Sequence, residues 1–102
     1  MQTHPRRRLE IVIEAPILKR VEALLSACAV HVYTVLEARS GRGLAGRWDD
    51  QSLSEGMDQR VLIAVTTQEA ADKVFAGMAE IFQRYPGVIY ASDVDVLRAE
   101  RF

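Results

Sequence analysis

The sequence contains little of what several classes of protein require. Its single cysteine, Cys28, excludes an intrachain disulfide and every metal site built on a cysteine pair. No apolar run approaches the ~18 residues of a membrane-spanning helix, so no integral membrane segment is expected. Glu10 and Glu14 interrupt the stretch after the first arginines, which therefore does not resemble a secretory signal peptide. A cytoplasmic location is expected.

Charge of one sign is not in excess either. The 102 residues carry 13 Lys and Arg against 14 Asp and Glu, a formal net charge of −1. Such a chain has no general attraction for nucleic acid, and any anionic ligand must be held by a local group of residues. The length allows one domain, and a composition that is 49% hydrophobic and 26% charged is ordinary for a soluble globular protein.

Catalytic and metal-binding patterns are also missing. The sequence has no Ser/His/Asp or Cys/His constellation, so a small enzyme is a weak hypothesis. His4 and His31 are far apart and do not suggest a metal site. Asp93 and Asp95 alternate as on a solvated strand face, although paired carboxylates also serve in acid–base catalysis. We expect no catalytic residues and no metal.

Hydrophobic periodicity predicts an α+β domain. Pro16 suits the first position of a helix that reaches Cys28, and Thr66 with Glu69 is typical of a capping box that starts a second helix, which Pro86-Gly87 ends. Alternating and β-branched residues predict strands at residues 9–14, 31–37, 60–66 and 88–97. The order βαββαβ indicates a ferredoxin-like fold, with a four-stranded antiparallel sheet and both helices on one face.

This plan leaves one face of the sheet without helices. Val12, Tyr33, Val35 and Ile89 make the strands too apolar for simple solvation, which favours self-association and clefts between subunits. Residues 1–8 are expected to be a flexible basic tail, so that the folded domain spans 9–102.

The longest connection is the hydrophilic stretch of residues 38–59. Its charges are sorted, since Arg39, Arg42 and Arg47 precede the acidic residues Asp49, Asp50, Glu55 and Asp58. Gly41 and Gly43 would let backbone amides turn toward a phosphate, and a neighbouring guanidinium would supply a planar charged fork. A lone G-x-G motif is weak evidence for an anion site, and the alternative is a flexible solvated loop. Trp48 could anchor a protein partner or fold back onto the base of the loop.

Several short strings resemble the PII signalling family, and the resemblance extends from Leu9 to about Leu97. They are Pro16, Leu18 and Val21 at the start of the first helix, V-Y-T-V at 32–35, G-R-G at 41–43, I-A-V-T at 63–66 and G-V-I-Y at 87–90. Val88 replaces the family's lysine, and the loop has no tyrosine for nucleotidyl modification. The strings are therefore more similar to the PII-like branch tied to inorganic carbon, which includes carboxysome-associated members.

The resemblance implies a non-enzymatic sensor. It implies a homotrimer that binds an adenine nucleotide in each intersubunit cleft, with residues 38–59 as the T-loop, bicarbonate as a second ligand and no other cofactor. ADP or AMP is favoured over ATP because Val88 removes a lysine that could meet the outer phosphates. The implied partner is an unidentified protein, a transporter or a carboxysome component.

The resemblance also implies site residues. Those implied for the nucleotide are Thr34, Gly41, Arg42, Gly43, Ala64, Gly87, Val88, Arg98 and Arg101. Those implied for bicarbonate or another anion on the T-loop are Ser40, Gly41, Arg42 and Arg47. The alternative function is a trimeric structural or metal-tolerance protein of the same topology that binds no nucleotide.

Overall fold

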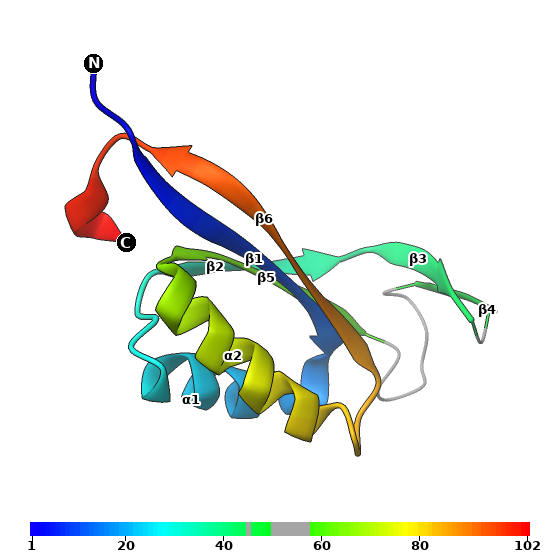
Figure 1. The fold of residues 1–102 in the computed structure, drawn as a ribbon. Helices are drawn as coiled ribbons and strands as arrows, with labels where there is room; N and C mark the ends of the chain where they lie inside the picture. Colours follow the sequence, from blue (N-terminus) through cyan, green and yellow to red (C-terminus); the bar gives the residue numbers. More distant parts are fainter. Residues whose placement is uncertain (45, 50–57) are drawn as a thin grey trace.

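The computed structural model describes residues 1–44, 46–49 and 58–102 (Figure 1). The elements, in chain order, are β1 (His4–Glu14), a 3-10 turn (Ala15–Ile17), α1 (Leu18–Ala27), β2 (Tyr33–Ala38), β3 (Ser40–Gly43), β4 (Gly46–Asp49), β5 (Gln59–Thr66), α2 (Gln68–Ile81), β6 (Gly87–Val96) and a second 3-10 turn (Ala99–Arg101). With the β3–β4 hairpin set aside, this is the predicted βαββαβ order. Neither helix in the described ranges is long and apolar enough to cross a membrane.

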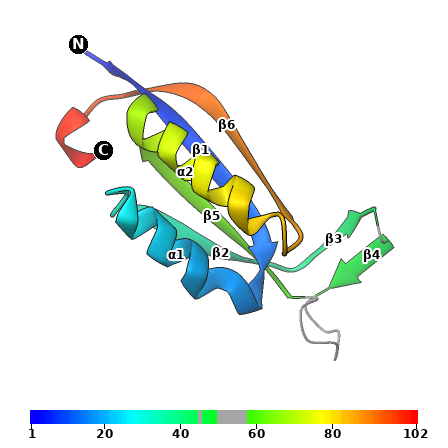
Figure 2. The same cartoon turned by 60° about the horizontal axis from the view of Figure 1, so that its bottom comes forward.

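The main sheet has four strands in the order β2-β5-β1-β6, and all its pairs are antiparallel. Both helices pack on the same face of this sheet, as Figures 1 and 2 show from two directions. The predicted ferredoxin-like fold is therefore confirmed. The β3–β4 hairpin projects from one end of the sheet, whereas both chain termini lie at the other end (Figures 1 and 2).

The core lies between the sheet and the two helices. Alternate residues of β1 (Leu9, Ile11 and Ile13) are at most 1% exposed, because their side chains all point toward the helices. The apolar stripes of the helices complete the core with Val21 and Leu25 from α1 and with Ala71, Val74 and Met78 from α2.

The face of the sheet that carries no helix is apolar, but mostly through residues other than those expected. Tyr33, Val35 and Ile89 lie on the helix side, where they pack against the core. Val12 does lie on the open face, since it alternates with the buried residues of β1. The open face is formed mainly by half-buried or exposed apolar residues: Val12, Leu36, Val61, Ile63, Val65, Val88, Tyr90, Val94 and Val96.

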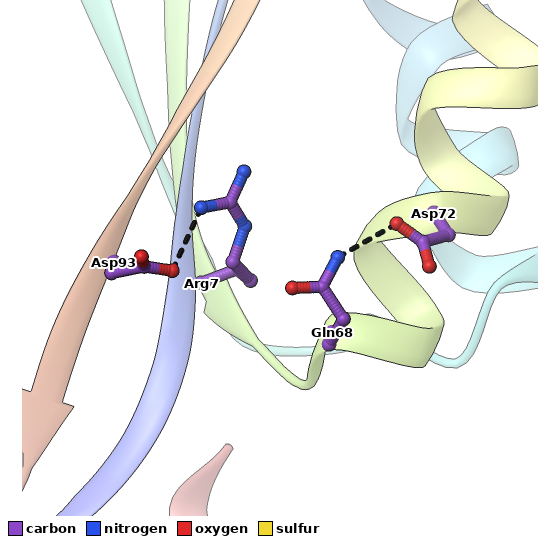
Figure 3. A network of polar contacts seen from close by, with 4 residues as sticks. All are labelled: Arg7, Gln68, Asp72 and Asp93. Carbon is purple, nitrogen blue, oxygen red and sulfur yellow. Dashed lines mark hydrogen bonds and ion pairs between the residues drawn. The ribbon is translucent and has the colours of Figure 1, made fainter.

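The expected flexible tail at residues 1–8 was wrong from His4 onward. β1 begins at His4, whose partner in β6 is Val96. The Nη1 of Arg7 lies 2.8 Å from the Oδ1 of Asp93 and ties the two strands together (Figure 3). The Nε of Arg6 donates to the backbone oxygen of Phe102 at 3.2 Å. A basic stretch with no apolar pattern is therefore ordered, because β6 and the C-terminal turn offer it partners.

The expected capping box at Thr66 was also wrong. Thr66 is the last residue of β5 and is only 5% exposed, because it continues the inward alternation of that strand. The N-cap is Thr67, whose Oγ1 accepts a hydrogen bond from the backbone N of Ala70 at 3.2 Å. The amide of Gln68 donates to Asp72 at 2.8 Å across the first turn of α2 (Figure 3).

Candidate functional site

Part of the expected loop at residues 38–59 is a β-hairpin. β3 and β4 pair antiparallel, with Gly41 opposite Trp48 and Arg42 opposite Arg47. Residue 45 and residues 50–57, which include the acidic residues Asp50 and Glu55, lie outside the described residues. Since side chains alternate along a strand, the hairpin has two different faces. One face carries Trp48 among glycines and the other carries the two arginines.

A cleft of about 610 Å³ lies where this hairpin leaves the main sheet. It brings together most of the residues that the sequence implicated near the loop: Gly41, Arg42, Gly43, Arg47, Gly87 and Val88. The remaining walls come from the end of β1, from Gln59, from Pro86 and from the hairpin residues Leu44, Gly46 and Trp48. The volume falls within the usual range of ~300–1,000 Å³ for small-molecule pockets.

Gly87 is required at the floor of this cleft. Its φ is +148°, a conformation that side chains disfavour. A Cβ at this position would lie 2.7 Å from the backbone oxygen of Val12 and 2.7 Å from the ring of Phe82. Glycine therefore lets the start of β6 pair closely with the end of β1, and this pairing places Val88 beside Val12 on the cleft wall.

Trp48 folds back onto the hairpin, as one of the two sequence hypotheses proposed. A Cβ at Gly41 would lie 2.6 Å from the Cζ2 of Trp48, so the indole rests directly on the glycine backbone. The side chain is half-buried and lines the cleft. At Gly43, in the same strand, a Cβ would meet nothing within 4 Å. The two glycines of G-R-G are therefore not equivalent.

The opposite face of the hairpin carries two arginines. Arg42 and Arg47 are directly opposed, both are exposed, and Ser40 lies on the same face. Side chains at opposed positions have Cβ atoms roughly 4.5–5.5 Å apart, and like charges there destabilise the pair. An anion bound between two guanidinium groups would relieve that repulsion through charge-assisted hydrogen bonds.

The structure does not bring the other predicted site residues to this cleft. Ala64 is 3% exposed within the core, so its side chain is not available to a ligand. Ala64 points toward the helices because it alternates with the outward residues Ile63 and Val65 of β5, and its part in ligand binding stays a prediction. Thr34 is exposed on the open face of the sheet, opposite Ile63 in the register.

Arg98 and Arg101 lie at the opposite end of the sheet from the cleft. β6 separates the two regions with 10 residues, a length of roughly 30 Å at ~3.4 Å per residue. Arg101 lines a smaller cavity of about 140 Å³ together with His31 and Phe102. The Nε of Arg98 lies 3.3 Å from Glu100 on the surface. One chain therefore cannot place these arginines beside Gly41 and Gly87.

Sequence reasoning missed Val12 and Gln59 as cleft residues. A usable signal was present, because the ferredoxin-like plan pairs the first strand with the third and the fourth. That pairing puts the end of β1 beside the start of β6, with Val12 opposite Val88. No motif marks such residues, and only the register of the sheet shows them.

Two tyrosines away from the cleft floor have shifted acidity. A hydrogen bond to the Glu22 carboxylate raises the pKa of Tyr33, whose hydroxyl lies 2.6 Å from Glu22 Oε2. Glu10, the register partner of Tyr90 on the open face, raises the pKa of Tyr90 in the same way. Both phenols therefore stay protonated near neutral pH. In the described part of the chain, no three His, Cys, Asp or Glu residues are grouped as metal ligands.

The fold and the cleft define a small ferredoxin-like protein with a cleft beneath a hairpin arm. The chain matches the family model of the nitrogen regulatory protein P-II over residues 6–101, and it belongs to that family. The resemblance inferred from the sequence is confirmed at this level. Association with the carboxysome stays a prediction.

Solved structures agree with this assignment. The chain is 25% identical to CPII from Thiomonas intermedia K12, a nitrogen regulatory PII-like protein bound to ADP, AMP and bicarbonate; 99% of this chain and 96% of that one are covered, with a TM-score of 0.89. A putative PII-like signaling protein from Thermus thermophilus is 24% identical, with 100% and 99% covered and a TM-score of 0.81. The B. subtilis GlnK–ATP complex is 14% identical, with 92% and 85% covered and a TM-score of 0.64. A comparison with curated protein sequences finds no significant match.

Proposed function

We propose that this protein is a non-enzymatic sensor that binds ADP or AMP together with bicarbonate in clefts between the subunits of a homotrimer. The observation that carries the proposal is the cleft beneath the hairpin, which gathers Gly41, Arg42, Gly87 and Val88 from segments far apart in the sequence. The ligands named for CPII, a relative similar over nearly its whole length, support the same chemistry here.

The position of Arg98 and Arg101 supports a site shared between subunits. These arginines lie about 30 Å along β6 from Gly87. A phosphate bound at Gly87 could be reached only by the C-terminal turn of a neighbouring copy. A cyclic trimer provides such a seam three times, each built from the hairpin end of one subunit and the C-terminal end of the next.

The open face of the sheet supports the trimer. Ile63 and Val65 at its centre, and Val88 and Tyr90 at its edge, would expose apolar surface to water in a lone subunit. A second copy would cover this apolar surface together with the ion pair of Arg8 and Glu10, whose Nη1 and Oε2 atoms lie 3.5 Å apart on the same face. Since Val12 and Val88 belong to both the face and the cleft, packing of a neighbour would also enclose the ligand site.

The charges of the cleft favour a small set of anions. Arg42 and Arg47 form a pair of guanidinium groups that suits a planar anion such as bicarbonate. Val88 adds no positive charge at the start of β6, which favours AMP or ADP over ATP. No group among the described residues of the cleft supplies an activated nucleophile, which supports a regulatory role.

Ligand binding at the hairpin would change the surface that this arm presents. The hairpin with nucleotide and bicarbonate bound would present a different surface from the ligand-free hairpin. A protein partner that binds only one of these two forms would respond to the ligands. The signal would report inorganic-carbon and energy status in the cytoplasm, to a transporter or a carboxysome component.

Calorimetric titration tests this function. AMP, ADP and ATP are each titrated with and without bicarbonate, and the oligomeric state is measured by sedimentation. We expect a trimer that binds AMP and ADP more tightly than ATP, with affinity for the nucleotide or for bicarbonate raised by the other. A trimer that takes up no nucleotide would refute the proposal and favour the structural or metal-tolerance alternative.

A further inference from the structure

The apolar face of the β3–β4 hairpin has one large side chain. Gly41 and Gly43 of β3 share this face with Gly46 and Trp48 of β4, because these positions pair across the hairpin. The indole rests on Gly41, where even a methyl group would come within 2.6 Å of it. Contact with the backbone of Gly41 therefore fixes the ring, and Trp48 also lines the cleft.

The rest of the cleft wall combines aliphatic side chains with the polar residues Glu14, Arg42, Arg47 and Gln59. Val12 and Val88 lie side by side in the register of β1 and β6, and Val88 is 53% exposed. Gly87 lines the cleft with its backbone alone, since the ring of Phe82 and the backbone of Val12 occupy the space where a side chain would lie. An aromatic plane together with aliphatic walls suits a planar heterocycle, whereas a phosphate or bicarbonate needs donors and charge.

We infer that Trp48 is a binding residue of this site and stacks on the planar base of the nucleotide. The inference rests on the proposed function and assigns the base, rather than the phosphates, to the glycine and tryptophan face of the hairpin. Arg42 and Arg47, which also line the cleft, then remain for the anionic groups. The role of Gly41 follows, since any side chain there would displace the indole.

Two other roles for Trp48 are less compatible with its position. An anchor for a protein partner would project outward, but this side chain is half-buried and covers Gly41. A purely structural ring would not need to face a cleft of about 610 Å³. The experiment therefore has to separate stacking on a base from support of the hairpin.

Trp48 is the only tryptophan of the chain, so its emission reports this position alone. ADP and inorganic pyrophosphate are titrated into the intact protein, with tryptophan emission and heat recorded together. We expect ADP to change the emission and pyrophosphate to leave it unchanged, because pyrophosphate carries no base. In the ligand-free protein, Gly41→Ala is expected to shift the emission, whereas Gly43→Ala should not.

A matched pair of variants measures the contribution of the ring. Trp48→Phe keeps an aromatic plane, and Trp48→Leu keeps apolar volume without one. We expect Trp48→Leu to weaken ADP binding by roughly 5- to 150-fold, the range for loss of base–aromatic stacking, and Trp48→Phe to recover most of it. Pyrophosphate binding should be equal in both variants.

Each outcome decides between the hypotheses. If ADP binds with heat but leaves the tryptophan emission unchanged, the stacking role is overturned and the proposed function stays intact. The same conclusion follows if Trp48→Leu binds ADP as tightly as the wild type. An equal emission change with pyrophosphate, or an equal loss of pyrophosphate and ADP binding in Trp48→Leu, would show that the ring only supports the hairpin. Absence of heat from both ADP and AMP would instead refute the proposed function itself.

Discussion

A site shared between two subunits can be tested by mixing two defective proteins. One carries Arg98→Ala with Arg101→Ala at the C-terminal end, and the other carries Arg42→Ala with Arg47→Ala on the hairpin. These two ends are separated by the length of β6 in one chain. If each seam combines both ends, neither variant alone has an intact site, but a mixed trimer can contain one.

The expected magnitudes follow from the interactions removed. Loss of a charged hydrogen bond costs about 1.5–3 kcal/mol, so each variant alone should bind ADP with bicarbonate roughly 10- to 150-fold more weakly. The guanidinium of Arg98 pairs with an exposed Glu100, so its release for a phosphate should cost little. After the variants are unfolded together and refolded at equal amounts, about a quarter of the seams should combine two intact ends.

Calorimetry of the refolded mixture measures the number of tight sites. We expect tight binding at about a quarter of the wild-type stoichiometry, from a population that sediments as trimers. Each variant refolded alone is the control and should show none. If the mixture regains no tight sites although its subunits have exchanged, the arginines of the two ends do not meet at one seam and the reasoning from β6 is refuted.

Three further predictions concern the assembly and the fold. Ile63→Glu on the open face should dissociate the trimer in sedimentation while circular dichroism stays native; an unchanged trimer would show that this face is not the interface. Thr67→Ala should lower the free energy of unfolding by about 1 kcal/mol, because it removes the cap on Ala70, and an unchanged denaturant midpoint would contradict this. The bond between Tyr33 and Glu22 raises the pKa of that phenol above its unfolded value, so its contribution is complete below about pH 10 and is lost as pH rises through the folded pKa. Tyr33→Phe should therefore be destabilising at neutral pH, and a difference from wild type that persists unchanged at strongly alkaline pH would refute this cause.

Local patterns in the sequence were enough to predict the fold. The alternation Leu9, Ile11, Ile13 is a local signal, and the structure buries all three residues. The alternation Leu62, Ala64, Thr66 carried similar information, since it places Ala64 and Thr66 on the buried face. The family resemblance instead implied that Ala64 contacts the ligand. The spacing of Thr66 and Glu69 indicated that Thr66 caps the second helix.

Non-local pairing explains what the sequence could not show. The β3 segment S-G-R-G has poor strand propensity, and it is a strand only because β4 pairs with it and Trp48 covers Gly41. Residues 4–8, three of which are arginines, pair with β6, and this pairing cannot be predicted from local sequence. The cleft likewise joins segments far apart in the chain, so the sequence predicted its glycines but not Val12 or Gln59.

The hydrogen bonds of Arg6 join the two ends of the polypeptide. Its guanidinium reaches the backbone oxygens of Phe102 and Ala99, the latter at 3.4 Å. Deletion of the first eight residues would remove these hydrogen bonds and free the turn that carries Arg98 and Arg101. The proposed shared site requires this turn, so the deletion would affect that site although none of the deleted residues lines the cleft.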